Sequence, residues 1–172
     1  MNDITDIINE MSGTNYSVDQ IASLNNISNI NHIEIGQTLV PNESFPDRSN
    51  QLLSMSSQHS KDWKINNPLY FKKMVNDRGP WDLKYDPDFD SSKYKGFVFN
   101  GEKIDFDAPA NIHYGYVGSS TWWGSTKFLL KQAGKNQVEK GASNSDWIDC
   151  CFGDDPRDTL NILKGINLYE NK

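Results

Sequence analysis

Residues 153 to 166 read GDDPRDTLNILKGI, and this stretch predicts a capped amphipathic helix at the end of the chain. Pro156 suits the first helical position, where its missing N–H would have no partner anyway. Asp155 is then the N-cap, and Asp158 adds negative charge to the first turn. The expected apolar face, spaced at helical intervals, consists of Leu160, Ile162, Leu163, Ile166 and Tyr169.

Two charged residues of this stretch are not needed to build the helix. Asp154 precedes the cap and is a candidate catalytic carboxylate. Arg157 is placed either to pair with a neighbouring carboxylate or to bind an anionic substrate. The alternative is that the whole stretch is only a capped helix packed on a core.

The amino-acid composition limits the classes of protein to which this chain can belong. The 172 residues suffice for one domain, or for a small and a medium one. Aromatic residues make up 12% of the chain and include five Trp, enough to build the core of a domain of about 120 residues. The net charge of −6, with no visible basic patch, argues against a protein that grips nucleic acid through its phosphates.

Cysteine usage and the absence of targeting segments bear on where the protein acts. Cys150 and Cys151 are adjacent, and because a bridge between neighbours is strained, we expect buried thiols. No apolar run is long enough to span a membrane, and the first residues do not resemble a signal peptide. We therefore expect no membrane partner, and export within a larger polypeptide or through a dedicated machine.

The first 42 residues predict two short helices and a strand. Ser17 opens the second helix with Gln20 at the capping-box position. Together, residues 4–8, 17–25 and 33–41 resemble a LysM module, most clearly in the ending IEIGQTLVP. The usual first strand is absent, so the module would keep an open edge. The resemblance implies binding of N-acetylglucosamine-containing glycans such as peptidoglycan, or else a vestigial domain that only positions its neighbour.

Residues 43–50 are predicted to form a linker, and residues 51–172 a second domain. A helix is expected from Asn67-Pro68 to Val75, and another from Ser125 or Thr126 to Ala133. Short strands are expected between 81 and 110, with a hairpin turn at Asn100-Gly101. The glycine-rich segment 110–118 is interpreted as a loop. The predicted fold is α+β: a helical LysM-like remnant, then a compact domain of helices around a small antiparallel sheet.

Four motifs occur in order in this second domain: GPWDLK at 79–84, ANIHYGYVG at 110–118, LLKQAG at 129–134 and FGDDPRD at 152–158. As a set they resemble the bacterial toxin 44 family of polymorphic toxin tips, over roughly residues 67 to 168. Ala110 stands where the family usually has Gly, and Phe152 where it has Tyr. The resemblance implies a toxin module at the end of a larger secreted or injected bacterial protein, neutralised in its producer by an immunity protein.

Several side chains in these motifs are candidate catalytic residues. His113 can act as a general acid or base near neutral pH, or be a hydrogen-bonded structural histidine. Asp154 and Asp82 can supply the carboxylate pair of glycoside cleavage, although each is also a plausible cap or turn residue. Asn111 can orient a substrate carbonyl or amide.

Other residues are candidates for binding the substrate. Lys84 and Arg157 can stabilise developing negative charge. Tyr114 flanks His113, and Trp81, Trp122 and Trp123 are either core or stacking platforms for sugars or bases. His32, His59 and His113 are too far apart in sequence to form a metal motif, and no cofactor is expected.

Three functions fit these features. The first is an antibacterial hydrolase that degrades peptidoglycan, favoured by the LysM-like module, the acidic charge and the aromatic residues. The second is a metal-independent ribonuclease toxin acting on RNA in the target cytoplasm, which would need a basic groove around Lys84, Lys127 and Arg157. The third is a glycan-binding module without catalysis. In each case the chain is expected to be secreted or delivered into a target bacterium.

Overall fold

The computed structural model describes residues 17–24, 27, 29, 45–90 and 94–172. The chain divides into two compact units, Met1–Pro46 and Asp47–Lys172. All 17 Lys and Arg residues lie in the second unit, where 17 Asp and Glu residues balance them. The first unit holds the other six carboxylates and no basic residue, so it carries the whole net charge of −6.

In the first unit, the predicted second helix is confirmed as α2, Val18–Leu24. Ser17 and Gln20 form the expected capping box: the Ser17 N–H donates to Gln20 Oε1 at 2.7 Å, and the Gln20 N–H donates to Ser17 Oγ at 3.2 Å. Ile21 is buried. The predicted first helix and the predicted strand of this unit lie outside the described residues.

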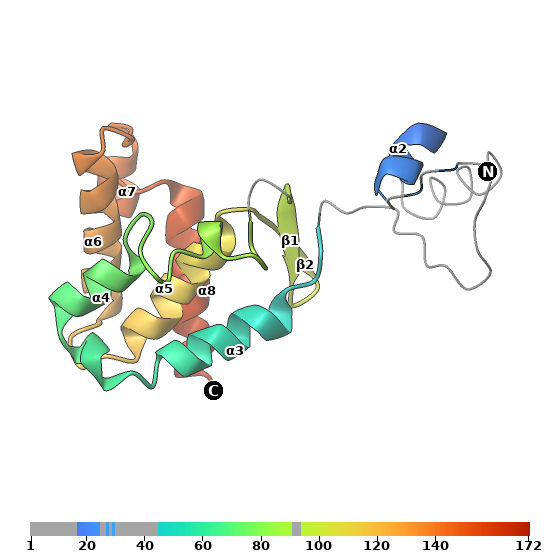
Figure 1. Cartoon of the computed structure of the whole chain (residues 1–172). Coiled ribbons are helices and arrows are strands. Elements are labelled where there is room, and N and C mark those ends of the chain that lie inside the picture. The colour runs from blue at the N-terminus through green and yellow to red at the C-terminus, as the bar shows by residue number, and fades with distance from the viewer. Residues whose placement is uncertain (1–16, 25–26, 28, 30–44, 91–93) are drawn as a thin grey trace. The chain divides into compact units, whose positions relative to one another are not determined.

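The second unit consists of helices with one small β-hairpin, which confirms the predicted α+β class (Figure 1). Asn67 caps the predicted helix at Pro68, and Ser125 caps the one at Thr126. In chain order, its elements are α3 (Ser49–His59), η1 (Trp63–Asn66), α4 (Pro68–Val75), η2 (Leu83–Tyr85), β1 (Gly96–Phe99), β2 (Glu102–Asp105), α5 (Ala108–Ser119), α6 (Thr126–Glu139), α7 (Trp147–Cys151) and α8 (Pro156–Glu170).

The hairpin forms where the Asn-Gly dipeptide predicted it. Phe99 pairs with Glu102 across a two-residue turn in which Asn100 and Gly101 both have positive φ, as the favoured hairpin turn requires. Phe97 and Phe99 on β1 are fully buried, because they point into the core from one face of the strand. The hairpin therefore anchors β2 beside the helices.

Helices α5 and α8 form the centre of the second unit (Figure 1). Gly115 on α5 lies against the backbone of Ile162, and Gly165 on α8 lies against the backbone of Ile112. A Cβ atom at either glycine would collide with a carbonyl oxygen, so the glycines permit the close approach. This packing sets the position of every residue near the start of α8.

The two central helices begin at the same end of the pair. Asn111 near the start of α5 bonds Asp158 near the start of α8, and Tyr116 near the end of α5 contacts Tyr169 near the end of α8. Both helix N-termini, with their partial positive charge, are therefore close to the carboxylates of the 152–158 motif.

Three expectations from the sequence are corrected. The segment 110–118 is not a loop but most of α5, which Pro109 helps to start and whose glycines serve helix packing. Leu160 is exposed and belongs to the outer face of α8, not to its apolar face. Cys150 and Cys151 are joined in a disulfide rather than being free buried thiols, and only Cys151 is buried. No helix in the described part of the chain has the length and apolar character needed to cross a bilayer.

Candidate functional site

The start of α8 brings carboxylates together as a consequence of how the helix begins. Asp155 is the N-cap, and its Oδ1 accepts the Arg157 N–H at 2.8 Å. Phe152 and Gly153 before it have positive φ and reverse the chain out of α7. This reversal places Asp154 inside the domain, where it is only 4% exposed.

Asp154 is a buried carboxyl group with few partners. Its Oδ2 accepts a hydrogen bond from Thr159 Oγ1 at 3.3 Å. Burial, together with the nearby charge of Asp158, raises the pKa of Asp154 to about 7. Asp154 therefore holds a proton at neutral pH much more readily than an exposed aspartate does. The pKa of Tyr114 is raised by burial, and the negative charge of ionised Asp154 raises it as well.

Asp158 lies in the first turn of α8 and is half-buried, and its charge acts on Asp154 just before the helix. Asn111 Nδ2 donates a hydrogen bond to Asp158 Oδ1 at 2.8 Å. Burial raises the pKa of Asp158 to about 6, with a further contribution from Asp107, while Lys84 lowers it. Both neighbouring carboxyls thus have raised pKa values close to neutrality, the range in which a carboxyl group can act as a general acid or base.

The cations of the site are already matched to carboxylates. Arg157 pairs with Asp155 at 3.1 Å and with Asp105 on β2 at 3.5 Å. Lys84 is exposed on η2, close enough to Asp158 to lower its pKa. These cations neutralise local negative charge, so they do not form an open basic groove. Lys127 lies on another element, α6.

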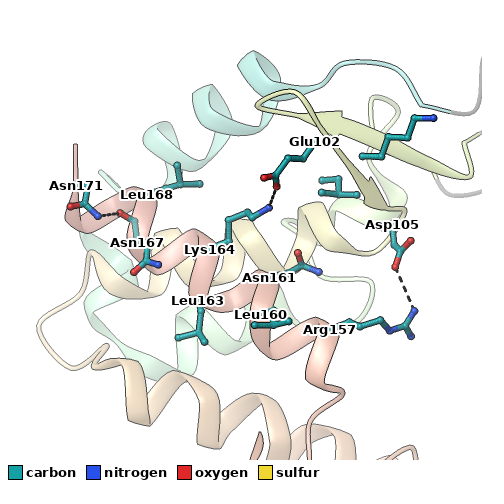
Figure 2. A pocket seen from close by; sticks show the side chains of 12 residues that line it. Glu102, Asp105, Arg157, Leu160, Asn161, Leu163, Lys164, Asn167, Leu168 and Asn171 are labelled. Carbon is teal, nitrogen blue, oxygen red and sulfur yellow. Dashed lines mark hydrogen bonds and ion pairs between the residues drawn. The ribbon is translucent and has the colours of Figure 1, made fainter. Parts of the chain in front are cut away.

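A groove of about 930 Å³ runs along the outer face of α8, between that helix and β2 (Figure 2). Arg157 and Asp105 lie at one end, whereas neither Asp154 nor Asp158 is among the residues that line the groove. Lys164 bridges to Glu102 at 2.6 Å further along. The α8 residues of the groove recur every three or four positions, and they are Arg157, Leu160, Asn161, Leu163, Lys164, Asn167, Leu168 and Asn171.

The predicted catalytic histidine lies away from this groove, in a pair with the half-buried His59 that the sequence did not indicate. His113 is 1% exposed, and its Nε2 lies 2.8 Å from Nδ1 of His59, the last residue of α3. The His59 ring stacks on Trp81 with centroids 4.1 Å apart. Burial lowers the pKa of His113 to about 3, so this ring stays neutral at any pH at which the folded protein would act.

The other predicted site residues are dispersed. Asp82 caps η2 by accepting the Lys84 N–H, and it also accepts the Arg78 N–H. The Tyr114 hydroxyl donates to the carbonyl of Leu129. Trp123 is half-buried and donates its indole N–H to the carbonyl of Ile65, whereas Trp122 is 82% exposed. None of the predicted aromatic residues lines the groove.

Two residues of functional interest were missed from the sequence. Asp158 was assigned only to the helix start, and the available signal was its place in the same FGDDPRD motif as Asp154. His59 lies in a serine-rich stretch with no motif, so no local pattern connects it with His113. Within the described residues, no group of three His, Cys, Asp or Glu side chains is arranged to hold a metal ion.

Comparison with protein families agrees with the motifs on which this site is built. The sequence model of bacterial toxin 44 matches residues 70–171, which is more than half of the chain. The chain belongs to the bacterial toxin 44 family. A LysM domain model matches residues 9–40. No curated protein and no solved structure matches the chain. The toxin 44 match spans the segment from α4 to the end of α8, including both members of the carboxylate pair.

Proposed function

We propose that this toxin 44 protein is a hydrolase that cleaves the glycan strands of peptidoglycan, with Asp154 as general acid and Asp158 as general base. The observation that carries the proposal is the carboxyl pair itself. Asp154, with a pKa of about 7, and Asp158, with a pKa of about 6, interact electrostatically at the start of α8, where Arg157 beside Asp158 lines a long groove. Glycoside cleavage needs one protonated and one ionised carboxyl group in this way.

In the proposed reaction, Asp154 donates its proton to the glycosidic oxygen as the bond from that oxygen to the anomeric carbon breaks. Asp158 takes a proton from a water molecule whose oxygen bonds to the anomeric carbon. Asn111 is a positioning residue: its amide holds Asp158 Oδ1 and favours the ionised form. Asp158 here takes the place of Asp82, whose carboxylate oxygens accept backbone N–H groups.

The groove and the LysM match favour a polymeric glycan substrate. The groove residues extend from Arg157 to Asn171, which corresponds to about 21 Å of helix at 1.5 Å per residue. Four of its charged side chains, Glu102, Asp105, Arg157 and Lys164, are in ion pairs, and Asn161, Asn167 and Asn171 supply amides, so the groove suits an uncharged polar chain. A LysM module would hold the enzyme on the same polymer.

The proposal is tested by incubating the full chain with purified peptidoglycan sacculi and, in parallel, with total bacterial RNA. We expect soluble muropeptides with new reducing ends and intact RNA. Toxicity should likewise require that the chain be directed to the periplasm of the test cell. Degraded RNA with intact sacculi would support the ribonuclease alternative and contradict the proposal.

A further inference from the structure

Three exposed apolar side chains stand out on neighbouring segments: Trp63 on η1, Leu69 on α4 and Trp122 in the loop before α6. Trp63 is 77% exposed, Leu69 79% and Trp122 82%. None of the three side chains lines the groove along α8, and none belongs to the carboxylate pair. Large side chains this exposed bury little apolar area in the folded chain, and clusters of them on a surface mark interaction sites.

Core contacts hold the three elements that carry these side chains together. Trp123, the neighbour of Trp122, donates its indole N–H to Ile65 of η1 at 3.2 Å. Its ring also contacts Phe71 of α4 and Phe128 of α6, with centroids 5.4 and 5.5 Å apart. Figure 1 shows α4 and the start of α6 at the same end of the domain. Trp63, Leu69 and Trp122 are therefore presented from one rigid assembly of elements.

The loop that carries Trp122 is itself rigid. Thr121 Oγ1 donates to the Gly118 carbonyl at 2.7 Å, and Gly124 packs so closely on that carbonyl that a Cβ atom would not fit. A side chain presented by such a loop loses little conformational freedom when it binds a partner.

The charge around these side chains is positive, although the domain as a whole is neutral. Residues 61 to 75 hold four lysines and one aspartate, and Asp62 already accepts the Tyr70 hydroxyl and the Lys64 N–H. Lys72 and Lys73 are exposed, as is Lys127 at the start of α6. Among the described residues, none of these three lysines lies within ion-pair distance of a carboxylate.

We propose that Trp63, Leu69, Lys72, Lys73, Trp122 and Lys127, here called the tryptophan–lysine face, form the docking surface for an acidic protein. Exposed Trp residues at the centre with charged side chains around them are the usual anatomy of a protein interface. Positive charge with no internal partner selects a negatively charged partner and speeds its association. A toxin domain implies an immunity protein, and that protein is the acidic partner this face fits.

The observations favour a protein over RNA as the occupant. The bases of RNA could stack on the two tryptophans, but the exposed aliphatic side chain of Leu69 offers no ring on which a base can stack. RNA binding also relies on many unpaired cations, and this domain has equal numbers of acidic and basic residues.

The test begins by selecting, from a DNA library of the producing organism, clones that protect cells from the toxin. The encoded protector is purified, and its affinity for the full chain is measured by calorimetry at low and high salt. Trp63→Ala and the double variant Lys72→Glu/Lys73→Glu should each weaken binding at least tenfold, and the double variant should also reduce the salt dependence. Ile148→Ala on α7 and Lys95→Glu just before β1, both exposed and outside the groove, are the matched controls and should bind like wild type. Thermal melts verify that all variants are folded.

Three outcomes would overturn the proposal. One is recovery of a protector that binds both face variants as tightly as wild type, and another is recovery of no protector at all. The third is a wild-type chain that binds RNA, with binding lost in the same two variants. Each outcome is independent of the peptidoglycan assay, because that assay measures muropeptide release in the absence of any protein partner.

Discussion

The side-chain amide of Asn111 donates a 2.8 Å hydrogen bond to Oδ1 of Asp158, and this bond joins the starts of α5 and α8. It lies where both helix N-termini meet the carboxylates of the family motif. The close approach of the helices at Gly115 and Gly165 sets the distance over which the bond forms. The central packing of the fold and the chemistry of the proposed site are therefore linked through these two residues.

Removing this hydrogen bond should move the acidic side of the pH–activity profile. In Asn111→Ala the ionised form of Asp158 loses a donor, so the pKa of Asp158 should rise from about 6 by roughly half a unit to one unit. The rate of muropeptide release should then fall off at a higher pH than in wild type, while the alkaline side moves less. An acidic limb at the wild-type position would show that Asp158 is not the ionising base.

Asp154 should destabilise the folded protein as the pH rises. Folding raises the pKa of Asp154 from 3.8 to about 7. The folded protein therefore binds this proton more tightly than the unfolded chain, and the free energy of unfolding falls as the pH rises between these two values. Asp154→Asn should therefore raise the free energy of unfolding at pH 8 by about 2 kcal/mol, and change it little at pH 4. Urea unfolding at the two pH values measures both quantities.

Asp155 provides the control of opposite sign for this experiment. Its hydrogen bonds with Arg157 hold the pKa of Asp155 below its ordinary value, so its contribution is present at neutral pH and lost in acid. Asp155→Asn should lower stability at pH 8. A stabilised Asp155→Asn, or a destabilised Asp154→Asn at pH 8, would contradict the assigned electrostatics.

The histidine pair should make the protein sensitive to acid. The pKa of His113 is lowered on folding from 6.5 to about 3, so stability is lost as the pH falls between these values. His113→Leu removes this dependence but leaves His59 without its hydrogen-bond partner, at a cost of about 1–3 kcal/mol at pH 7. Melting temperatures at pH 7 and pH 5 should differ less in the variant than in wild type. An equal difference would mean that His113 is not buried in neutral form.

The glycines between α5 and α8 should be intolerant of a methyl group. Gly115→Ala or Gly165→Ala places a Cβ atom against the backbone of the facing helix, which should cost about 3 kcal/mol and separate Asn111 from Asp158. Both stability and activity should fall. Glu170→Ala, on the exposed end of α8, is the control and should melt like wild type. Wild-type stability in both glycine variants would contradict the close packing.

Local signals predicted local structure well. The cap at Asp155, the Asn-Gly hairpin, and the helices that begin at Pro68 and Thr126 were all predicted from a few neighbouring residues, because caps and turns depend on local chemistry. Helix α5 was missed because its glycines were interpreted as signs of a loop. The close approach of other helices explains them: Gly115 lies against the backbone of α8, and Gly118 lies against Leu129 of α6.

The site could be predicted only in part, because its key relationships join residues far apart in the chain. Asp154 and Asn111 were singled out from their motifs. The pairing of Asn111 with Asp158 joins residues 47 positions apart, and that of His59 with His113 joins residues 54 positions apart. No local pattern encodes such pairings. Likewise, burial alone decides which tryptophans are core and which, like Trp122, are exposed.

The most direct test of the account is the release of reducing ends from purified peptidoglycan at pH 6.5 by wild type, Asp154→Asn, Asp158→Asn and Asp82→Asn. The account predicts that the Asp154 and Asp158 variants each lose at least a hundredfold in rate, since general acid–base catalysis contributes factors of about 10² to 10⁴. The Asp82 variant, which keeps a side-chain oxygen to cap η2, should stay within about threefold of wild type. A loss confined to Asp82→Asn, or wild-type rates in Asp158→Asn, would contradict the account.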